Sequence, residues 1–216
     1  MATVTAFDKV NRLRDAAESQ MTYEQFFGEM DLTDEQKRRR IQIAEDIEDD
    51  VMIFFLLYAL SLERNVEVDH ARAVEELKEN LRKSLELSNI QMAVIMSYLV
   101  DVVDEEARVT AERYRDDPYW TSDERAKTIA RNDANTVMFS QEFQDAVASG
   151  MTGKRWVTMG DERVRKTHAA VDGEIVPIND PFVVGNSLLL YPRDMSMNPD
   201  PDEIVNCRCS VSYLRI

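Results

Sequence analysis

Two cysteines, the only ones among 216 residues, lie one residue apart near the end of the sequence, in the segment Asn206-Cys207-Arg208-Cys209. A thiolate can bind a metal or act as a nucleophile, and a neutral thiol can fill a buried apolar site. An extended segment would hold the two Cα atoms roughly 6.5–7 Å apart, at the limit of disulfide geometry. Three interpretations remain: buried apolar side chains, two metal ligands, or one reactive thiol.

A metal site at this pair would need further ligands, because zinc commonly takes four from Cys, His and carboxylate side chains. His168 and Asp172 are the candidates, and a helix that reached Asp172 would present both on one face. Together with Cys207 and Cys209 they would form a zinc site. The alternative for His168 is a structural hydrogen bond, for example to Asp172. The other histidine, His70, lies in a charged segment and is expected to be solvated.

Signatures of common enzyme classes are missing from the sequence. It contains no G-x-S-x-G, no Walker loop, no G-x-G-x-x-G and no H-E-x-x-H. Zinc deaminases also use a histidine and two cysteines, but their H-x-E and P-C-x-x-C strings are absent. We therefore expect no enzymatic activity, no small-molecule substrate and no cofactor, unless zinc is bound. The alternative is a metal-dependent, nuclease-like hydrolase built on the four candidate ligands.

The charge of the chain is unevenly distributed. Residues 1–150 hold 18 basic and 32 acidic side chains, whereas residues 151–216 hold 8 and 9. An acidic surface repels duplex phosphates, so the first part is expected to meet protein partners. The basic run Lys37-Arg38-Arg39-Arg40 is expected to be a solvated first turn of a helix. A second basic group could contact DNA or a protein partner: Lys154, Arg155, Arg163, Arg165 and Lys166.

No segment is expected to enter a membrane. The most apolar run, residues 51–62, has twelve residues, whereas a spanning helix needs about 20. It is expected to be a buried core helix. The first residues show no apolar signal core, and two cysteines do not make a secreted disulfide scaffold. We therefore expect synthesis in a reducing cytoplasm.

The first two thirds of the sequence predict long helices. Residues 1–30 are weakly helical, with Phe7, Val10 and Leu13 at helical spacing. Thr33 and Gln36 fit a capping box, which predicts a helix from there to about Glu63. The long helices make this part an elongated, mostly helical region.

A second long helical stretch begins at the next cap, Asp69, and contains no Gly or Pro until Pro118. It predicts one very long helix or two collinear helices, with Ser88-Asn89 as the weakest point. Ser122 is expected to begin a further helix that ends at Gly150. Its predicted apolar face consists of Ile129, Val137, Phe143 and Val147.

After Gly150 the composition changes, because four of the six Gly and five of the six Pro fall there. "KRWVTM", "NSLLLYP" and the run after Asp172-Gly173 predict short strands, and "DERVRKTHAAV" predicts a short helix. The final "CRCSVSYL" alternates, which would place both cysteines on one face of a strand. The fold class is α+β, with short antiparallel strands expected in the C-terminal part. We expect a helical body over residues 1–118 and a second domain over 119–216, made of a helix at 122–149 and a small α+β unit at 151–216.

The second domain resembles the phage head morphogenesis family, the Mu F-like minor head proteins, over about residues 123–213. The resemblance rests on an ordered set of elements: Trp156 and Thr158, Asp161-Glu162, Arg165 and His168, Asp172-Gly173, Phe182, Tyr191-Pro192 and Asn206-Cys207-Arg208-Cys209. The preceding "RAKTIARNDAN" is similar to the family's "IARTE" helix, with Asn132-Asp133 where Thr-Glu is usual.

The resemblance implies a virion structural protein. Such proteins are made in the cytoplasm of the infected bacterium and enter the phage head in few copies. They associate with the portal and other head proteins, and assist head assembly and DNA packaging or delivery. The resemblance also implies that the second basic group could contact packaged DNA or the portal protein. On this basis we expect five residues to form a structural motif: Trp156, Arg165, Gly173, Phe182 and Asn206.

Overall fold

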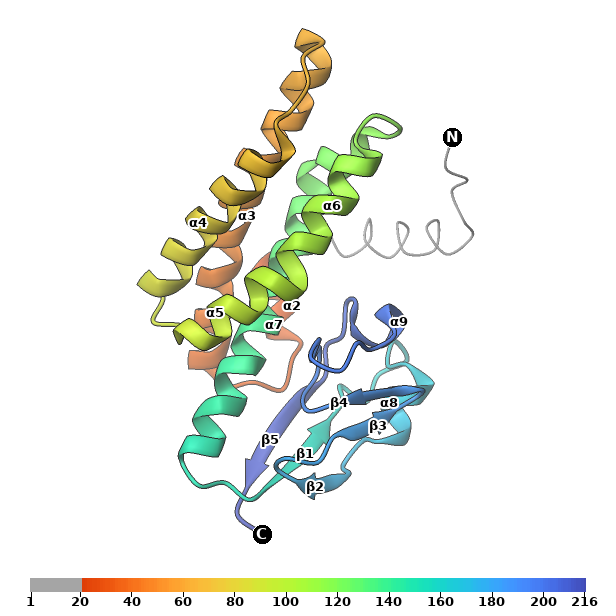
Figure 1. The fold of residues 1–216 in the computed structure, drawn as a ribbon. Helices are drawn as coiled ribbons and strands as arrows, with labels where there is room; N and C mark the ends of the chain where they lie inside the picture. Colours follow the sequence, from red (N-terminus) through yellow and green to blue (C-terminus); the bar gives the residue numbers. More distant parts are fainter. Residues whose placement is uncertain (1–20) are drawn as a thin grey trace.

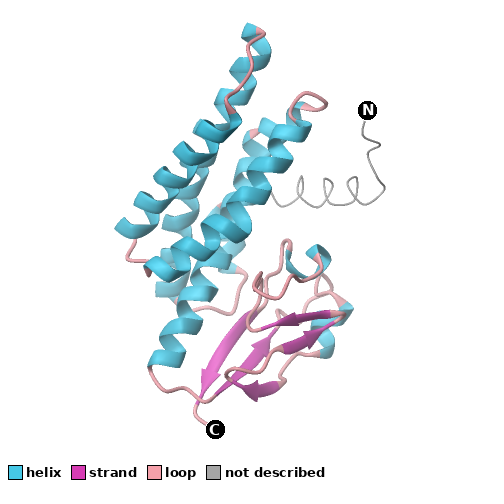
Figure 2. Ribbon diagram, in the orientation of Figure 1, coloured by secondary structure: helices cyan, strands magenta, loops and turns pink. Residues whose placement is uncertain are grey.

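The computed structural model describes residues 21–216, and the predicted helix around Phe7, Val10 and Leu13 lies outside the described residues. An elongated group of helices stands beside a small unit of short strands (Figure 1). Within residues 21–216, strands are confined to the C-terminal unit (Figure 2). The α+β class and the antiparallel pairing predicted from the sequence are confirmed.

The described portion of the helical part is built from eight successive elements. They are α2 (Tyr23–Gly28), α3 (Asp34–Arg64), α4 (His70–Leu87), α5 (Met92–Tyr98), the π-helix η1 (Leu99–Val103), α6 (Asp104–Arg113), the 3₁₀-helix η2 (Pro118–Thr121) and α7 (Asp123–Ala148). Among the described residues, no helix combines the length and the apolar character needed to cross a bilayer.

The predicted helix starts are confirmed by their caps. The Thr33 hydroxyl accepts from the amide of Gln36, whose side chain in turn accepts from the amide of Thr33. Asp69 caps α4 and Ser122 caps α7 in the same way. Each side chain accepts a hydrogen bond from the backbone amide three residues further along the chain. Each cap satisfies a donor that the first turn of a helix leaves without a partner.

Among the described helices, three are followed by a residue in the left-handed conformation. Asn65, Asn89 and Gly150 have φ angles of 50°, 57° and 73°. At Asn89 the amide bonds to Glu86 and the next amide bonds to the carbonyl of Leu85, the Schellman pattern. The chain therefore reverses direction between α4 and α5 (Figure 1). The weak point at Ser88-Asn89 was correctly located, but the prediction of one long helix or two collinear helices is wrong.

The helix α7 lies at the centre of the molecule. It packs along α3 and also contacts α5 and η2. Almost every side chain between Arg125 and Phe139 is buried, polar ones included, because neighbours surround the helix. Val147, predicted on its apolar face, is 43% exposed. The predicted domain boundary near residue 118 stays a prediction, and α7 shares its core with the helices before it.

The basic run at the start of α3 is not uniformly solvated. Arg40 is fully buried and forms a bidentate ion pair with Glu142 of α7, at 2.8 and 2.9 Å. Its Nε donates to Asn135 at 2.9 Å. The expectation of a solvated turn is wrong for Arg40, because α7 covers that face of α3 with matching acceptors.

The C-terminal unit contains two small antiparallel sheets and two short helices. Its elements are β1 (Gly153–Val157), α8 (Lys166–Ala170), β2 (Ile175–Pro177), β3 (Phe182–Val184), β4 (Ser187–Leu189), α9 (Pro201–Ile204) and β5 (Ser210–Leu214). The three-stranded sheet has the order β2-β1-β5, and β3 pairs with β4. In the first sheet Trp156 lies opposite Val211.

The cysteine pair does not lie on the last strand. That strand begins at Ser210, and Cys207 and Cys209 precede it in an irregular segment. The segment starts at Asn206, which has a φ of 53°, so the chain turns sharply before it becomes extended. The period-two pattern predicted the strand but placed its start three residues too early.

Candidate functional site

Three side chains from distant points of the chain converge inside the C-terminal unit. His168 Nδ1 lies 3.3 Å from Cys209 Sγ and 3.6 Å from Cys207 Sγ. The three possible ligand atoms all lie within 4.8 Å of one another. All three side chains are buried, and both cysteines are free thiols. The convergence expected from the sequence is therefore present for these three residues.

Asp172, the fourth predicted ligand, does not belong to this cluster. The helix α8 ends at Ala170, so Asp172 does not continue the face of His168. Its carboxylate is exposed and accepts from the amide of Thr158 at 2.7 Å. The neighbouring Gly173 has a φ of 76°, and its amide bonds to the carbonyl of Trp156. Asp172 and Gly173 thus shape the turn that leads into β2.

Glu203, and not Asp172, is the carboxylate that contacts His168. Its Oε2 lies 3.0 Å from His168 Nε2 and accepts from the Thr167 hydroxyl at 2.8 Å. Glu203 lies on α9, 35 residues from His168, and is 9% exposed. One ring nitrogen of His168 thus meets a carboxylate while the other meets two sulfur atoms. No spacing rule would have selected Glu203, because the contact is purely tertiary.

Aromatic rings enclose the cluster. Trp156 is fully buried, and its ring meets the rings of His168 and Phe182 edge to face, at centroid distances of 5.6 and 5.2 Å. The side chain of Trp156 also interacts with Cys209 and opposes the rise in the pKa of that thiol. Trp156 and Phe182 form a small hydrophobic core together with both cysteines, and this core is separate from that of the helical part. The cluster therefore sits in a low-polarity interior where charged groups interact strongly.

The protonation of the cluster is strongly perturbed. Cys207 forms a hydrogen bond with Cys209 and lies beside His168. These two interactions hold the pKa of Cys207 well below its usual range, although burial opposes this. The hydrogen bond with Cys207 and burial raise the pKa of Cys209. Burial opposes protonation of His168, but its hydrogen bond and charge interaction with Cys207 outweigh that effect and raise the pKa of the imidazole. The arrangement favours a thiolate at Cys207 beside an imidazolium.

The segment that carries the cysteines is anchored to α7. The Asn206 amide donates to Asn132 Oδ1 at 3.1 Å, and Asn132 Nδ2 donates to Asn206 Oδ1 at 3.2 Å. Arg193 also donates to Asn132 Oδ1, at 2.8 Å. The side chain of Arg165 bonds to the carbonyl of Val205 and so joins the start of α8 to the same segment.

A second group of polar side chains is buried beneath this anchor and was not anticipated. Asp133 of α7 accepts from the hydroxyl of Tyr98 at 2.7 Å and interacts with Glu106 of α6. Burial raises the pKa of Asp133 to about 6. Burial and the charge of Asp133 raise the pKa of Glu106. The two carboxyl groups therefore resist being ionised together.

The predicted basic stripe is not a continuous surface. Lys154 is fully buried and donates to the carbonyl of Ile178 at 2.7 Å, so its prediction as a DNA or portal contact is wrong. Arg163 forms an ion pair with Glu29 of the helical part. Arg155 and Lys166 are exposed. Strand alternation explains the difference, since Lys154 and Arg155 are neighbours on β1 and point to opposite faces.

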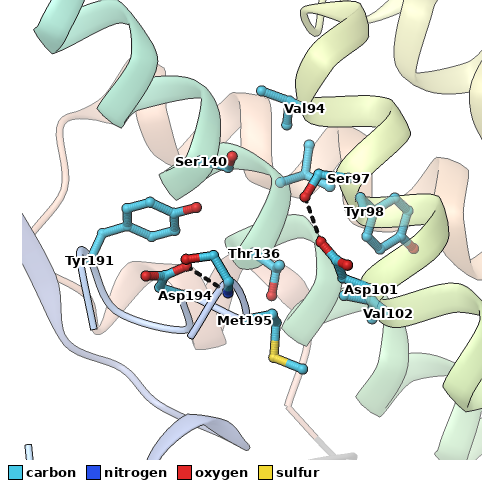
Figure 3. A pocket seen from close by; sticks show the side chains of 12 residues that line it. Val94, Ser97, Tyr98, Asp101, Val102, Thr136, Ser140, Tyr191, Asp194 and Met195 are labelled. Carbon is cyan, nitrogen blue, oxygen red and sulfur yellow. Dashed lines mark hydrogen bonds between the residues drawn. The ribbon is translucent and has the colours of Figure 1, made fainter. Parts of the chain in front are cut away.

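Two of the hollows among the described residues are small and are lined in part by the C-terminal unit. One, of about 20 Å³, borders the cluster at His168 and Cys209, and Arg163, Arg165 and Arg208 also line it. The other, of about 30 Å³, lies between η1, α7 and the loop around Asp194 (Figure 3). That second hollow touches none of the three clustered side chains. Neither has the size of a small-molecule pocket.

The fold and the buried cluster define an α+β protein whose C-terminal unit is held together by tertiary polar contacts. The family model described as "Phage Mu protein F like protein" matches residues 103–212. No curated protein and no solved structure matches the chain.

The chain belongs to the Phage Mu protein F-like family, because the match covers half of its length. It is a bacteriophage head morphogenesis protein, and its location is the virion. The matched range begins within η1, earlier than the resemblance seen in the sequence, and includes α6 and α7 with the C-terminal unit.

Proposed function

We infer that this protein is a minor head protein that associates with the portal and assists head assembly and DNA packaging or delivery. It would be made in the cytoplasm of the infected bacterium and enter each head in few copies. The observation that carries this proposal is the family match over residues 103–212. The packing of the matched part against α3 supports it, since the family unit and the preceding helices share one core.

The surface of the helical part supports a role in binding other proteins. Met92, Met96 and Val100 are about half exposed, at 48%, 50% and 59%, and are spaced four residues apart along α5 and η1. This spacing places them on one side of the helix, as a contiguous apolar stripe. We propose that the stripe contributes to contact with the portal or another head protein.

Direct contact with packaged DNA has weaker support. Residues 1–150 are strongly acidic, and of the five basic side chains expected to form a stripe, Lys154 is buried and Arg163 is paired. The alternative function, a metal-dependent hydrolase delivered with the DNA, would require an open site beside a cleft. The burial of the Cys-His cluster favours an architectural role over that alternative.

A pull-down tests the portal association. The tagged chain and the portal protein of the same phage are co-expressed, and we expect the two to co-purify. Met96→Asp should weaken the complex, whereas Lys127→Asp, an exposed change on α7, should leave it intact. A folded wild-type chain that retains neither the portal nor any other head protein would contradict the proposal.

A further inference from the structure

We propose that Cys207, Cys209 and His168 bind one zinc ion, with Glu203 orienting the histidine. The three side chains supply two sulfur ligands and one nitrogen ligand. Among the common biological metals, zinc is the one that such a ligand set favours. The proposal concerns the internal architecture of the C-terminal unit and stands independently of the portal association.

The distances within the cluster fit a tetrahedral zinc ion. Bonds of about 2.3 Å to sulfur and 2.0 Å to nitrogen, at tetrahedral angles, place a nitrogen and a sulfur ligand about 3.5 Å apart. His168 Nδ1 lies 3.3 Å from Cys209 Sγ and 3.6 Å from Cys207 Sγ. The two sulfur atoms lie within 4.8 Å of each other, and two zinc-bound thiolates would be about 3.8 Å apart. Only small side-chain adjustments are therefore needed.

The contact between His168 and Glu203 supports the same assignment. A histidine that binds zinc through one ring nitrogen usually donates its other N–H to a carboxylate, which fixes the tautomer and the ring orientation. Glu203 Oε2 lies 3.0 Å from Nε2, on the side of the ring away from the sulfur atoms. Glu203 is itself held by Thr167. Nδ1 is thereby left to the metal.

The fourth position of the ion has room for a water molecule. The hollow of about 20 Å³ that borders His168 and Cys209 exceeds the roughly 10–15 Å³ that one water requires. It is too small for an organic substrate, and the three protein ligands are buried. The metal would thus stabilise the fold, linking α8 to the segment before β5.

Metal analysis of the purified full chain, prepared under reducing conditions without chelator, tests the proposal. We expect about one zinc per chain, and a thiolate-to-cobalt charge-transfer band after substitution with Co²⁺. Cys207→Ser and Cys209→Ser should lower zinc affinity at least tenfold. Glu203→Gln should lower it about 10- to 100-fold. Asp172→Asn is the matched control, because this exposed carboxylate lies outside the cluster.

X-ray absorption at the zinc edge of the wild-type chain tests the proposal even if the cysteine variants fail to fold. The expected spectrum shows two sulfur ligands near 2.3 Å and a nitrogen near 2.0 Å. A spectrum with oxygen and nitrogen ligands only would overturn the proposal. So would a folded wild-type chain that takes up neither zinc nor cobalt, or one whose Cys207 is rapidly alkylated in excess zinc.

Discussion

Asn132, in the middle of α7, and Asn206, the residue before the cysteine pair, bond to each other twice. The Asn206 amide donates to Asn132 Oδ1 at 3.1 Å, and Asn132 Nδ2 donates to Asn206 Oδ1 at 3.2 Å. Two segments of the family resemblance that are 74 residues apart in sequence are therefore one structural unit. The pair explains why the segment before Cys207 requires an amide side chain at a left-handed backbone position.

Asn132→Ala should destabilise the protein by about 1–3 kcal/mol, because it removes an acceptor that two donors share. Those donors are the Asn206 amide and the guanidinium of Arg193. Urea unfolding followed by circular dichroism measures the effect. Lys127→Ala, an exposed change on the same helix, should stay within about 0.5 kcal/mol of wild type. Equal effects of the two changes would refute the anchoring role.

Removing one partner of the ion pair between Arg40 and Glu142 should cause a large loss of stability. Glu142→Ala leaves a fully buried guanidinium without its carboxylate and should cost about 3–5 kcal/mol. Glu35→Ala removes the partner of Arg38 in an exposed pair of the same chemistry, with side chains 73% and 67% exposed, and should cost less than about 1 kcal/mol. Thermal unfolding of the two variants provides the comparison, and a small loss for Glu142→Ala would show that water reaches Arg40.

Asp133 predicts how stability depends on pH. Its pKa is raised from 3.8 to about 6, and the charged or titratable groups acting on it are Tyr98, Glu106, Arg125 and Arg193. Because the folded state holds the proton more tightly, the stabilising contribution is complete below about pH 4 and is lost as the pH rises through about 6. Asp133→Asn should therefore gain stability relative to wild type between pH 4 and 7.5, by about 1–3 kcal/mol. Urea midpoints at both pH values measure this, and a pH-independent difference would contradict it.

Gly185, between β3 and β4, predicts a steric effect on the cluster. A Cβ atom there would collide with the carboxylate of Glu203 and press on Thr167. Gly185→Ala should displace Glu203 from His168 and destabilise the C-terminal unit. Gly173→Ala is the matched control, because Gly173 also has a positive φ but open space around it, so only the backbone cost of about 1 kcal/mol is expected. Equal unfolding midpoints for the two variants would show that Glu203 adapts freely.

Local signals in the sequence predicted the helix starts at Thr33 and Ser122, the stop at Gly150 and several short strands. These features depend on a few neighbouring residues, which is why they can be inferred without the fold. The reversal at Asn89 was missed because asparagine tolerates both helix interiors and left-handed caps, and packing of α5 against α7 decides between them.

The candidate site was predictable in part. The rarity of cysteine and histidine drew attention to His168, Cys207 and Cys209, and these three do meet. The prediction of Asp172 as the fourth ligand was wrong, and the contact of Glu203 with His168 was missed. Carboxylates are abundant in the sequence, and only the tertiary structure shows which one faces an imidazole. The burial of Lys154 likewise depends on α7 and Phe143, which the strand pattern cannot show.

The most direct test of the head-protein assignment is an asymmetric cryo-electron microscopy reconstruction of purified phage heads, combined with quantitative mass spectrometry of the same particles. The account predicts a few copies per head, with density for α3, α4 and the C-terminal unit beside the portal ring. Purified heads from which this chain is absent, although it is expressed during infection, would contradict it.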